Sequence, residues 1–174
     1  PTQRPLMPDL FTHVASGFIV GRRFFFDHRL GFILLGSVLP DLMSRVPQIL
    51  LQRFLDLPVA HFFSAFHTPT ALIVSSYLIS FVFAPNVRKI GFWLILSGSL
   101  FHFGLDLLQR QFYKPIYMPW FPFSFEAVQF PWFHIHASLL VAPIFLLAML
   151  YLWARDLRRN RAYTRSWRSF RRPN

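Results

Sequence analysis

Apolar residues gather in five runs along the chain, and short stretches rich in arginine, proline and aspartate separate them. A helix needs roughly 20 apolar residues to cross a bilayer, and the last two runs come close to this length. The first two runs are shorter, and we predict that they form a tilted or half-buried hairpin. The five runs cover residues 10–26, 30–42, 61–84, 90–108 and 134–153.

Proline and charge mark the breaks between the runs. Because the second run stops at Pro40-Asp41 and arginines follow, we expect residues 43–60 to form a loop with a short interfacial helix. Residues 86–89 are expected to be a turn. Four prolines exclude a continuous helix over residues 109–133, which we expect to lie along the membrane interface. Its anchoring aromatic residues would be Tyr113, Tyr117, Trp120 and Trp132.

The composition supports a membrane protein. Of the 174 residues, 54% are hydrophobic and 14% are charged, whereas soluble domains have about 25% charged residues. We therefore predict an all-α fold, a polytopic membrane helical bundle in a single domain over residues 1–154, with a basic tail over 155–174. No cleavable signal peptide is expected, since no apolar core with a small-residue cleavage site opens the chain.

The positive charge is unevenly distributed and predicts an orientation. The net charge is +11, and eight of the eighteen lysines and arginines follow Trp153. Such a tail marks the cytoplasmic side and rests on anionic lipid headgroups. Five crossings with the C-terminus inside would place thirteen cations inside and five outside, which agrees with the positive-inside bias. Specific nucleic-acid binding is less favoured, because the aromatic residues of the tail also suit headgroups.

This orientation is deduced from lysine and arginine alone. It predicts that histidines and aspartates lie at one membrane level. His102 and Asp106 lie four residues apart on one helical face, and such groups are costly at bilayer depth unless something pairs with them. His28 is the exception and is expected at the surface. The polar residues of the outer level are His13, Asp41, His61, His67, His102, Asp106, His134 and His136.

Several interpretations of this level stay open: a metal site, a proton relay, or a structural His–Asp pair between helices. Cysteine is absent, so a metal would be held by His, Asp or Glu, which suits zinc or another first-row divalent ion. Such an ion lowers the pKa of bound water to about 7 and supports hydrolysis. Taken singly, His61, His134 and His136 equally suit headgroup contacts. Ser97 and Ser99 are expected to bond within their helix or to allow close packing.

Four motifs follow one another along residues 7 to 122. They are Thr12-His13, Gly36-Ser-Val-Leu-Pro-Asp41, Phe66-His-Thr68 and His102-Phe-Gly-Leu-Asp106, and Met118-Pro-Trp-Phe-Pro122 comes after them. This order resembles the membrane-bound metal-dependent hydrolases, which are bacterial and archaeal inner-membrane proteins. Many members have a second acidic residue where this chain has Met43.

The resemblance implies a metal site, with zinc expected, and a multi-pass protein of the prokaryotic inner membrane with a cytoplasmic C-terminus. The implied substrate is an ester or phosphoester of a lipid-like molecule at the outer face. Asp41 or Asp106, where it is not a ligand, would be the catalytic base. The implied ligands are His13, Asp41, His67, His102 and Asp106, with His61, His134 and His136 as additional candidates.

Two alternatives remain for the function. One is a non-catalytic subunit of a larger membrane protein complex, which would keep the fold and dock through residues 112–133. The other is a transporter or proton-relay component that uses the same histidines and aspartates. The short runs and the lack of a broken-helix repeat make transport the less favoured of the two.

Overall fold

The structure is a computed structural model that describes residues 8–24, 29–55, 63, 65–110, 118–128, 130 and 133–170. This part of the chain is all-α, apart from one two-residue parallel pairing of β1 (Gln109–Arg110) with β2 (Phe133–His134). Among the described residues, one 3-10 turn, η1 (Ala65–His67), precedes the helix that begins at Pro69. The five α-helices are α1 (Pro8–Phe24), α2 (Arg29–Leu55), α4 (Pro69–Ser80), α5 (Pro85–Leu108) and α6 (Ile135–Phe170).

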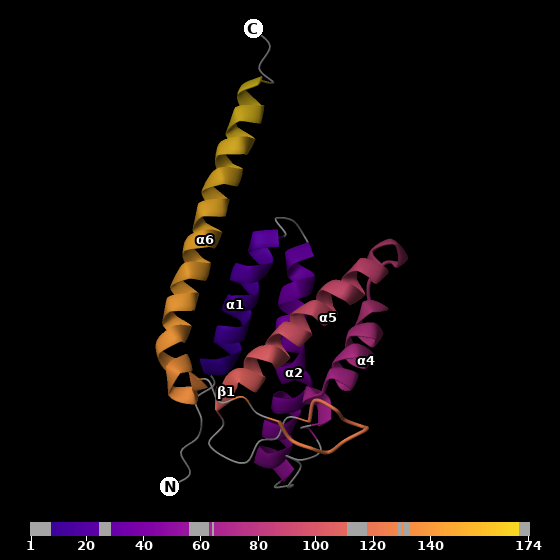
Figure 1. Cartoon of the computed structure of the whole chain (residues 1–174). Helices are drawn as coiled ribbons and strands as arrows, with labels where there is room; N and C mark the ends of the chain where they lie inside the picture. Colours follow the sequence, from indigo (N-terminus) through magenta and orange to yellow (C-terminus); the bar gives the residue numbers. More distant parts are fainter. Residues whose placement is uncertain are drawn as a thin grey trace.

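The helices form a bundle in which α2 lies between α1 and α5 (Figure 1). Helix α5 packs against α2 on one side and α4 on the other. Helix α6 lies against α1 and extends beyond the other helices toward the C-terminus (Figure 1). The four motifs of the sequence therefore come from elements that contact α2 or α5 directly.

Two segments of the described chain are long and apolar enough to cross a membrane, Arg29–Leu51 and Pro85–Leu108. Helix α4 is apolar but has only 12 residues, and α1 has 17. Large apolar side chains such as Leu78 and Val82 are exposed, while polar side chains such as Ser76 and Ser99 are buried. This distribution suits lipid surroundings. The predicted arrangement of five crossings goes beyond these two segments and stays a prediction.

The predicted end of the second run at Pro40-Asp41 is wrong, because α2 continues through both Pro40 and Pro47 to Leu55. A proline in a helix leaves the carbonyl four residues earlier without its usual N–H donor, here the carbonyl of Gly36. The Ser99 hydroxyl of α5 donates a hydrogen bond to that oxygen at 3.0 Å. A neighbouring helix thus supplies the missing donor, as a buried backbone carbonyl requires.

The crossing of α2 and α5 depends on two glycines. A Cβ atom at Gly36 would collide with the backbone carbonyl of Ile95, and one at Gly98 would collide with the carbonyl of Ile33. The two backbones are therefore in direct contact, which is how small residues promote helix association in membranes. The expectation for the nearby serines is confirmed, since Ser97 donates to the Trp93 carbonyl of its own helix and Ser99 bridges the crossing.

Helices α4 and α5 both begin at a proline. Helix α4 starts at Pro69, and the Thr68 hydroxyl accepts a hydrogen bond from the Ala71 N–H as its N-cap. It ends at Ser80, so the predicted run over 61–84 is too long. The turn predicted at 86–89 is also wrong. These residues form the first turn of α5. Proline is favourable at the first helical position, because an N–H group there would have no partner within the helix and proline lacks one.

Helix α6 continues from Ile135 to Phe170 and passes through the boundary between domain and tail predicted at residue 154. Residues 118–128 form turns and irregular backbone, and Thr70 of α4 donates a hydrogen bond to the Phe121 carbonyl. The absence of a continuous helix over this stretch agrees with the prediction. Of the expected interface aromatics, Trp120 is exposed, and Tyr113, Tyr117 and Trp132 lie outside the described residues.

Candidate metal centre

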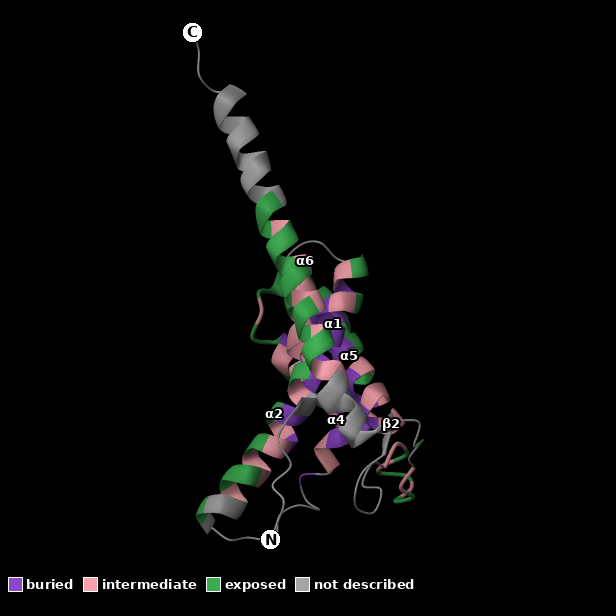
Figure 2. Ribbon diagram, turned by 90° about the vertical axis from the view of Figure 1, so that its left-hand side faces the viewer, coloured by how far each residue is buried: buried purple, intermediate pink, exposed green. Residues whose placement is uncertain are grey.

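Five polar side chains from four elements meet in the interior of the bundle. The structure brings His13 of α1, Asp41 of α2 and His67 of η1 together with His102 and Asp106 of α5. None of the five is more than 4% exposed. Buried residues concentrate where α1, α2 and α5 come together (Figure 2). Two overlapping groups of these residues could hold a metal ion, one of His13, Asp41 and His102 and one of His67, His102 and Asp106.

The carboxylate of Asp106 faces all three imidazole rings. Its Oδ1 lies 3.2 Å from His13 Nε2, and its Oδ2 lies 3.4 Å from both His67 Nε2 and His102 Nε2. The i, i+4 spacing on α5 brings His102 and Asp106 to the same side of the helix. Asp106 is fully buried, so these rings and any ion between them must balance its charge.

Asp41 faces two of these imidazoles from α2. Its Oδ1 lies 3.5 Å from His67 Nε2 and 3.8 Å from His102 Nε2. Donors at about 2.0–2.2 Å from a tetrahedral zinc ion lie about 3.3–3.6 Å apart. In the group of His67, His102 and Asp106, both nitrogen–oxygen separations are 3.4 Å and fall in that range. All four separations are longer than a direct charged N–H···O hydrogen bond, about 2.7–2.9 Å.

The backbone of α2 sets the tautomer of His102. Its Nδ1 lies 2.7 Å from the Ser37 carbonyl oxygen. A carbonyl only accepts, so Nδ1 must carry the proton and donate it. In the neutral ring, Nε2 therefore presents a lone pair toward Asp106 and Asp41. A histidine that binds a metal through one nitrogen normally donates the other N–H to a carbonyl in this way.

A hydroxyl relay sets the same tautomer in His67. The Ser44 hydroxyl donates to the Pro40 carbonyl at 2.7 Å, and it lies 2.7 Å from His67 Nδ1. A hydroxyl has a single hydrogen, so Ser44 must accept from the Nδ1–H of His67. The Nε2 lone pair of His67 then also faces the two carboxylates.

In the neutral rings, two lone pairs thus face two carboxylates in a buried space, and a cation among them would balance the two negative charges. The residues present fit a divalent metal ion. His102 Nε2 and both carboxylate oxygens of Asp106 have no hydrogen-bond partner among the described residues. Buried polar atoms are nearly always paired, so such a group calls for a partner such as a bound ion or water. Neutral imidazoles and two carboxylates also match the preferred donors of zinc.

His13 approaches the same residues from α1. Its imidazole stacks on that of His102, with ring centroids 4.0 Å apart, and its Nε2 lies 3.2 Å from Oδ1 of Asp106. It also forms a group with Asp41 and His102 that could hold a metal ion. A fifth donor in this position suits an additional ligand or a positioning partner of Asp106.

Three additional candidates cannot be placed in the cluster. His61 lies outside the described residues, and only the backbone of His134 and His136 is described, in β2 and the first turn of α6. Their roles as ligands stay predictions.

The sequence interpretation missed two neighbours of Asp41. Ser44 orients His67, and Arg45 forms an ion pair with Asp41 through Nε at 2.9 Å. Both were assigned to a loop because Pro40 was taken as a helix end. Their spacing of three and four residues after Asp41 is the signal that a continuing helix would have offered.

No family model, curated protein or solved structure matches this chain. Function is therefore inferred from the cluster itself.

Proposed function

We propose that this chain is a membrane-bound metal-dependent hydrolase. One observation carries the proposal: the Nε2 lone pairs of His67 and His102, oriented by Ser44 and the Ser37 carbonyl, face the carboxylates of Asp41 and Asp106. A structural His–Asp pair would place an N–H against a carboxylate at hydrogen-bond distance. Here the N–H groups point outward, as they do around a metal ion.

The donor set favours zinc, with His67, His102 and Asp106 as the residues that would hold it. When bound, a divalent ion supplies Lewis-acid polarisation of an ester or phosphoryl oxygen and acidifies a water molecule. The three imidazoles and the full burial of Asp106 suit this carboxylate to a charge-balancing role.

Asp41 has a different position and a different proposed role. It lines a pocket, whereas Asp106 is fully buried. We assign to the Asp41 carboxylate the proton that the attacking water loses, and that proton then passes to the leaving alcohol. The substrate would be an ester or phosphoester of a lipid-like molecule that reaches the site from the bilayer, and the chain would be a multi-pass protein of a prokaryotic inner membrane with a cytoplasmic C-terminus.

A second candidate function is that of a non-catalytic subunit of a larger membrane complex. The exposed aromatic side chains of residues 118–130 favour it, since Phe123 is 94% exposed and Trp120 and Phe125 are also exposed. Clustered exposed aromatics are common at protein and membrane contacts. In this case the cluster would bind a metal for structure only.

Metal analysis and a hydrolysis assay on the same purified protein test both functions. We expect about one zinc ion per chain, and its loss in the Asp106→Asn and His102→Ala variants. Asp156→Asn, which changes an aspartate on α6, is the matched control and should keep the metal. Hydrolysis is followed with p-nitrophenyl ester and p-nitrophenyl phosphodiester probes in detergent micelles.

The outcomes separate the proposals. Zinc with hydrolysis that is lost in Asp41→Asn supports the enzyme. Zinc without hydrolysis of either probe overturns the enzyme and favours the structural subunit. A folded wild-type chain that binds no divalent ion at all overturns the metal site itself. Circular dichroism of each variant verifies that the helices remain.

A further inference from the structure

A small pocket lies beside Asp41, between the first turn of α1 and the middle of α2. It has a volume of about 60 Å³ and is lined by Leu10, Val38, Asp41, Leu42, Arg45 and Val46. Its accessible surface is almost wholly apolar. Leu42 and Val46 are 50% and 39% exposed, so the pocket opens at the outer surface of the bundle, where lipid tails would lie. The pocket therefore connects the hydrocarbon to the neighbourhood of the candidate metal centre.

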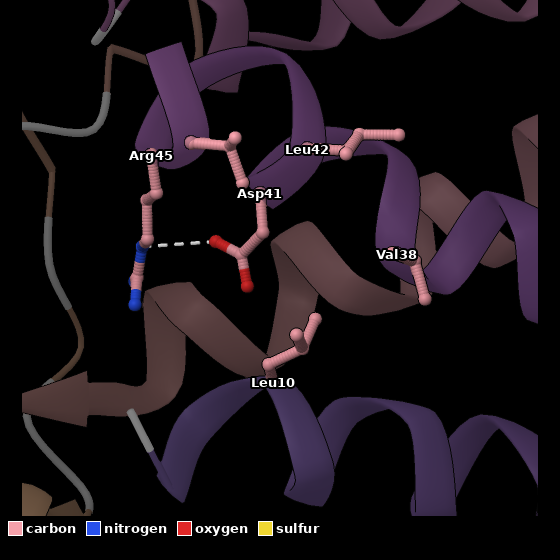
Figure 3. Close-up of a pocket in the computed structure, with 6 residues that line it drawn as sticks. Leu10, Val38, Asp41, Leu42 and Arg45 are labelled. Atoms are coloured by element: carbon pink, nitrogen blue, oxygen red, sulfur yellow. Dashed lines mark ion pairs between the residues drawn. The ribbon is translucent and has the colours of Figure 1, made fainter. Parts of the chain in front are cut away.

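The two carboxylate oxygens of Asp41 have different surroundings. Oδ1 lies 2.9 Å from Arg45 Nε, 3.5 Å from His67 Nε2 and 3.8 Å from His102 Nε2. No hydrogen bond or ion pair among the described residues uses Oδ2. Figure 3 shows this second oxygen pointing away from Arg45 and toward Leu10, on the opposite wall of the pocket. Asp41 is only 4% exposed, so Oδ2 is a buried acceptor that calls for a partner from the pocket.

The apolar walls and the open acceptor together select the chemistry of a ligand. A carboxylate oxygen only accepts hydrogen bonds, so the polar group of the ligand must be a donor. A phosphate or carboxylate group would be repelled by Asp41 and would meet an almost wholly apolar surface. An ammonium group has three donors and would leave two of them against hydrocarbon. A hydroxyl group has a single hydrogen, so an aliphatic alcohol matches both the acceptor and the walls.

The volume limits the groups that the alcohol carries near its hydroxyl. A water molecule occupies about 30 Å³ in the liquid, and a methylene group is of similar size, so the pocket holds only a few of them. A second hydroxyl on the neighbouring carbon would lie against Leu10 or Val38 without a partner, which is costly. The rest of the chain would leave the pocket beside Leu42 and remain in the bilayer. The pocket therefore favours simple alkyl alcohols over glycerol and headgroup alcohols.

We propose that this pocket binds the alcohol part of an ester substrate, with its oxygen at Asp41 Oδ2 and its first methylene groups against Leu10 and Val38. This inference rests on the proposed function, in which Asp41 takes a proton from the attacking water. The bond between the alcohol oxygen and the acyl or phosphoryl centre breaks, and the water oxygen with its remaining hydrogen joins that centre. The proton on Asp41 passes to the alcohol oxygen, and the released hydroxyl then donates to Oδ2. The substrate class is thereby narrowed to esters of uncharged alkyl alcohols.

Photolabelling of the zinc-loaded full chain in detergent micelles tests alcohol binding without relying on catalysis. The reagent is an octanol that carries a diazirine, and mass spectrometry of the digested protein locates the adducts. We expect adducts on Leu10, Val38, Leu42 and Val46 that excess 1-octanol prevents. Octyl methyl ether lacks the donor, 1,2-octanediol adds a second hydroxyl, and octyl phosphate is anionic. Each of these three should compete at least about tenfold less well than 1-octanol.

Two tryptophan variants test where the alcohol binds. Leu42→Trp narrows the opening and should abolish the adducts on Leu10 and Val38. Leu50→Trp places the same side chain at a similarly exposed position of α2 outside the pocket, where Leu50 is 49% exposed, and should leave these adducts unchanged. Zinc content and circular dichroism should be unchanged in both variants.

Asp41→Asn tests the acceptor itself. An amide donates as well as accepts, so octyl methyl ether should then compete about as well as 1-octanol. A pocket that selects only by shape would show the same order of competitors in this variant as in the wild type.

The outcomes separate this inference from the proposed function. Equal competition by 1-octanol and octyl methyl ether in the wild type, or unchanged adducts in Leu42→Trp, overturns the inference and leaves the proposed function standing. Adducts in the pocket of a zinc-loaded protein that hydrolyses neither p-nitrophenyl probe overturn the proposed function, and with it the role of the alcohol as a leaving group. A wild-type chain that binds no divalent ion overturns the metal site and both proposals that rest on it.

Discussion

The α2–α5 crossing and the α1–α6 pair associate by different physics. At the α2–α5 crossing, Gly36 and Gly98 bring the two backbones into direct contact, and Ser99 bonds across the crossing. The α1–α6 pair carries an ion pair between Arg22 and Asp156, which are 15% and 17% exposed. None of the described side chains of α6, over residues 141–158, is buried.

The difference explains where the candidate metal centre lies. Lipid tails are as apolar as leucine, so close backbone contact and hydrogen bonds hold membrane helices together better than apolar side chains do. Close approach at the crossing also lets His102 of α5 reach the Ser37 carbonyl of α2. The crossing therefore supports both the fold and the orientation of a ligand, whereas the α1–α6 contact supports only the helix pair. A substitution at the α2–α5 crossing should therefore lower the free energy of unfolding more than a substitution at the α1–α6 contact.

The largest effect is expected from Gly36→Ala. The added methyl group meets the Ile95 carbonyl, which cannot move without shifting α5. We expect a loss of about 1–3 kcal/mol in the free energy of unfolding, which is typical of overpacking. Zinc content should also fall, because the shift separates His102 from Ser37. Unfolding in detergent micelles and metal analysis measure the two effects.

Gly31→Ala is the matched control on the same helix, since a Cβ atom there meets nothing within 4 Å. Alanine favours helix over glycine by up to about 1 kcal/mol, so this variant should be as stable as the wild type or more so. Equal destabilisation in the two variants would show that the close approach at Gly36 is unimportant.

An intermediate effect is expected from Ser44→Ala. It removes the acceptor of the His67 Nδ1–H and frees the ring to change tautomer. Loss of such an outer partner lowers metal affinity by about 10–100-fold, and titration against a zinc-sensitive dye measures the change. Ser97→Ala removes an exposed hydroxyl that bonds only within α5, so its zinc affinity should not change. Equal affinities for all three proteins would contradict the tautomer argument.

The smallest effect is expected at the α1–α6 pair. Replacement of Arg22 by Gln, of Asp156 by Asn, and of both together forms a double-mutant cycle. Because the pair is partly exposed, its coupling should be at most about 1 kcal/mol, should decrease with salt, and should leave zinc content unchanged. A coupling larger than the cost of Gly36→Ala would reverse the ranking of the two contacts.

The sequence predicts an element correctly where a long apolar run with helical spacing lies within that element. The run over 90–108 predicts all of α5 except its first five residues, and the i, i+4 spacing brings His102 and Asp106 to one side. The prediction failed at α2, because proline predicts a helix end unless a neighbour supplies the lost hydrogen bond. Ser99, 59 residues after Pro40 in the chain, supplies it, and no local pattern contains that contact.

The sequence by itself determined the helical class, the excess of apolar residues and the restriction of metal ligands to histidine and carboxylate, because these follow from composition and spacing. It also indicated that histidines and aspartates share one level. Only the tertiary structure decided which of them face one another and which nitrogen of each ring points inward. Those choices depend on the Ser37 carbonyl and the Ser44 hydroxyl, whose positions follow from the approach of α2 and α5 at Gly36 and of η1 to α2.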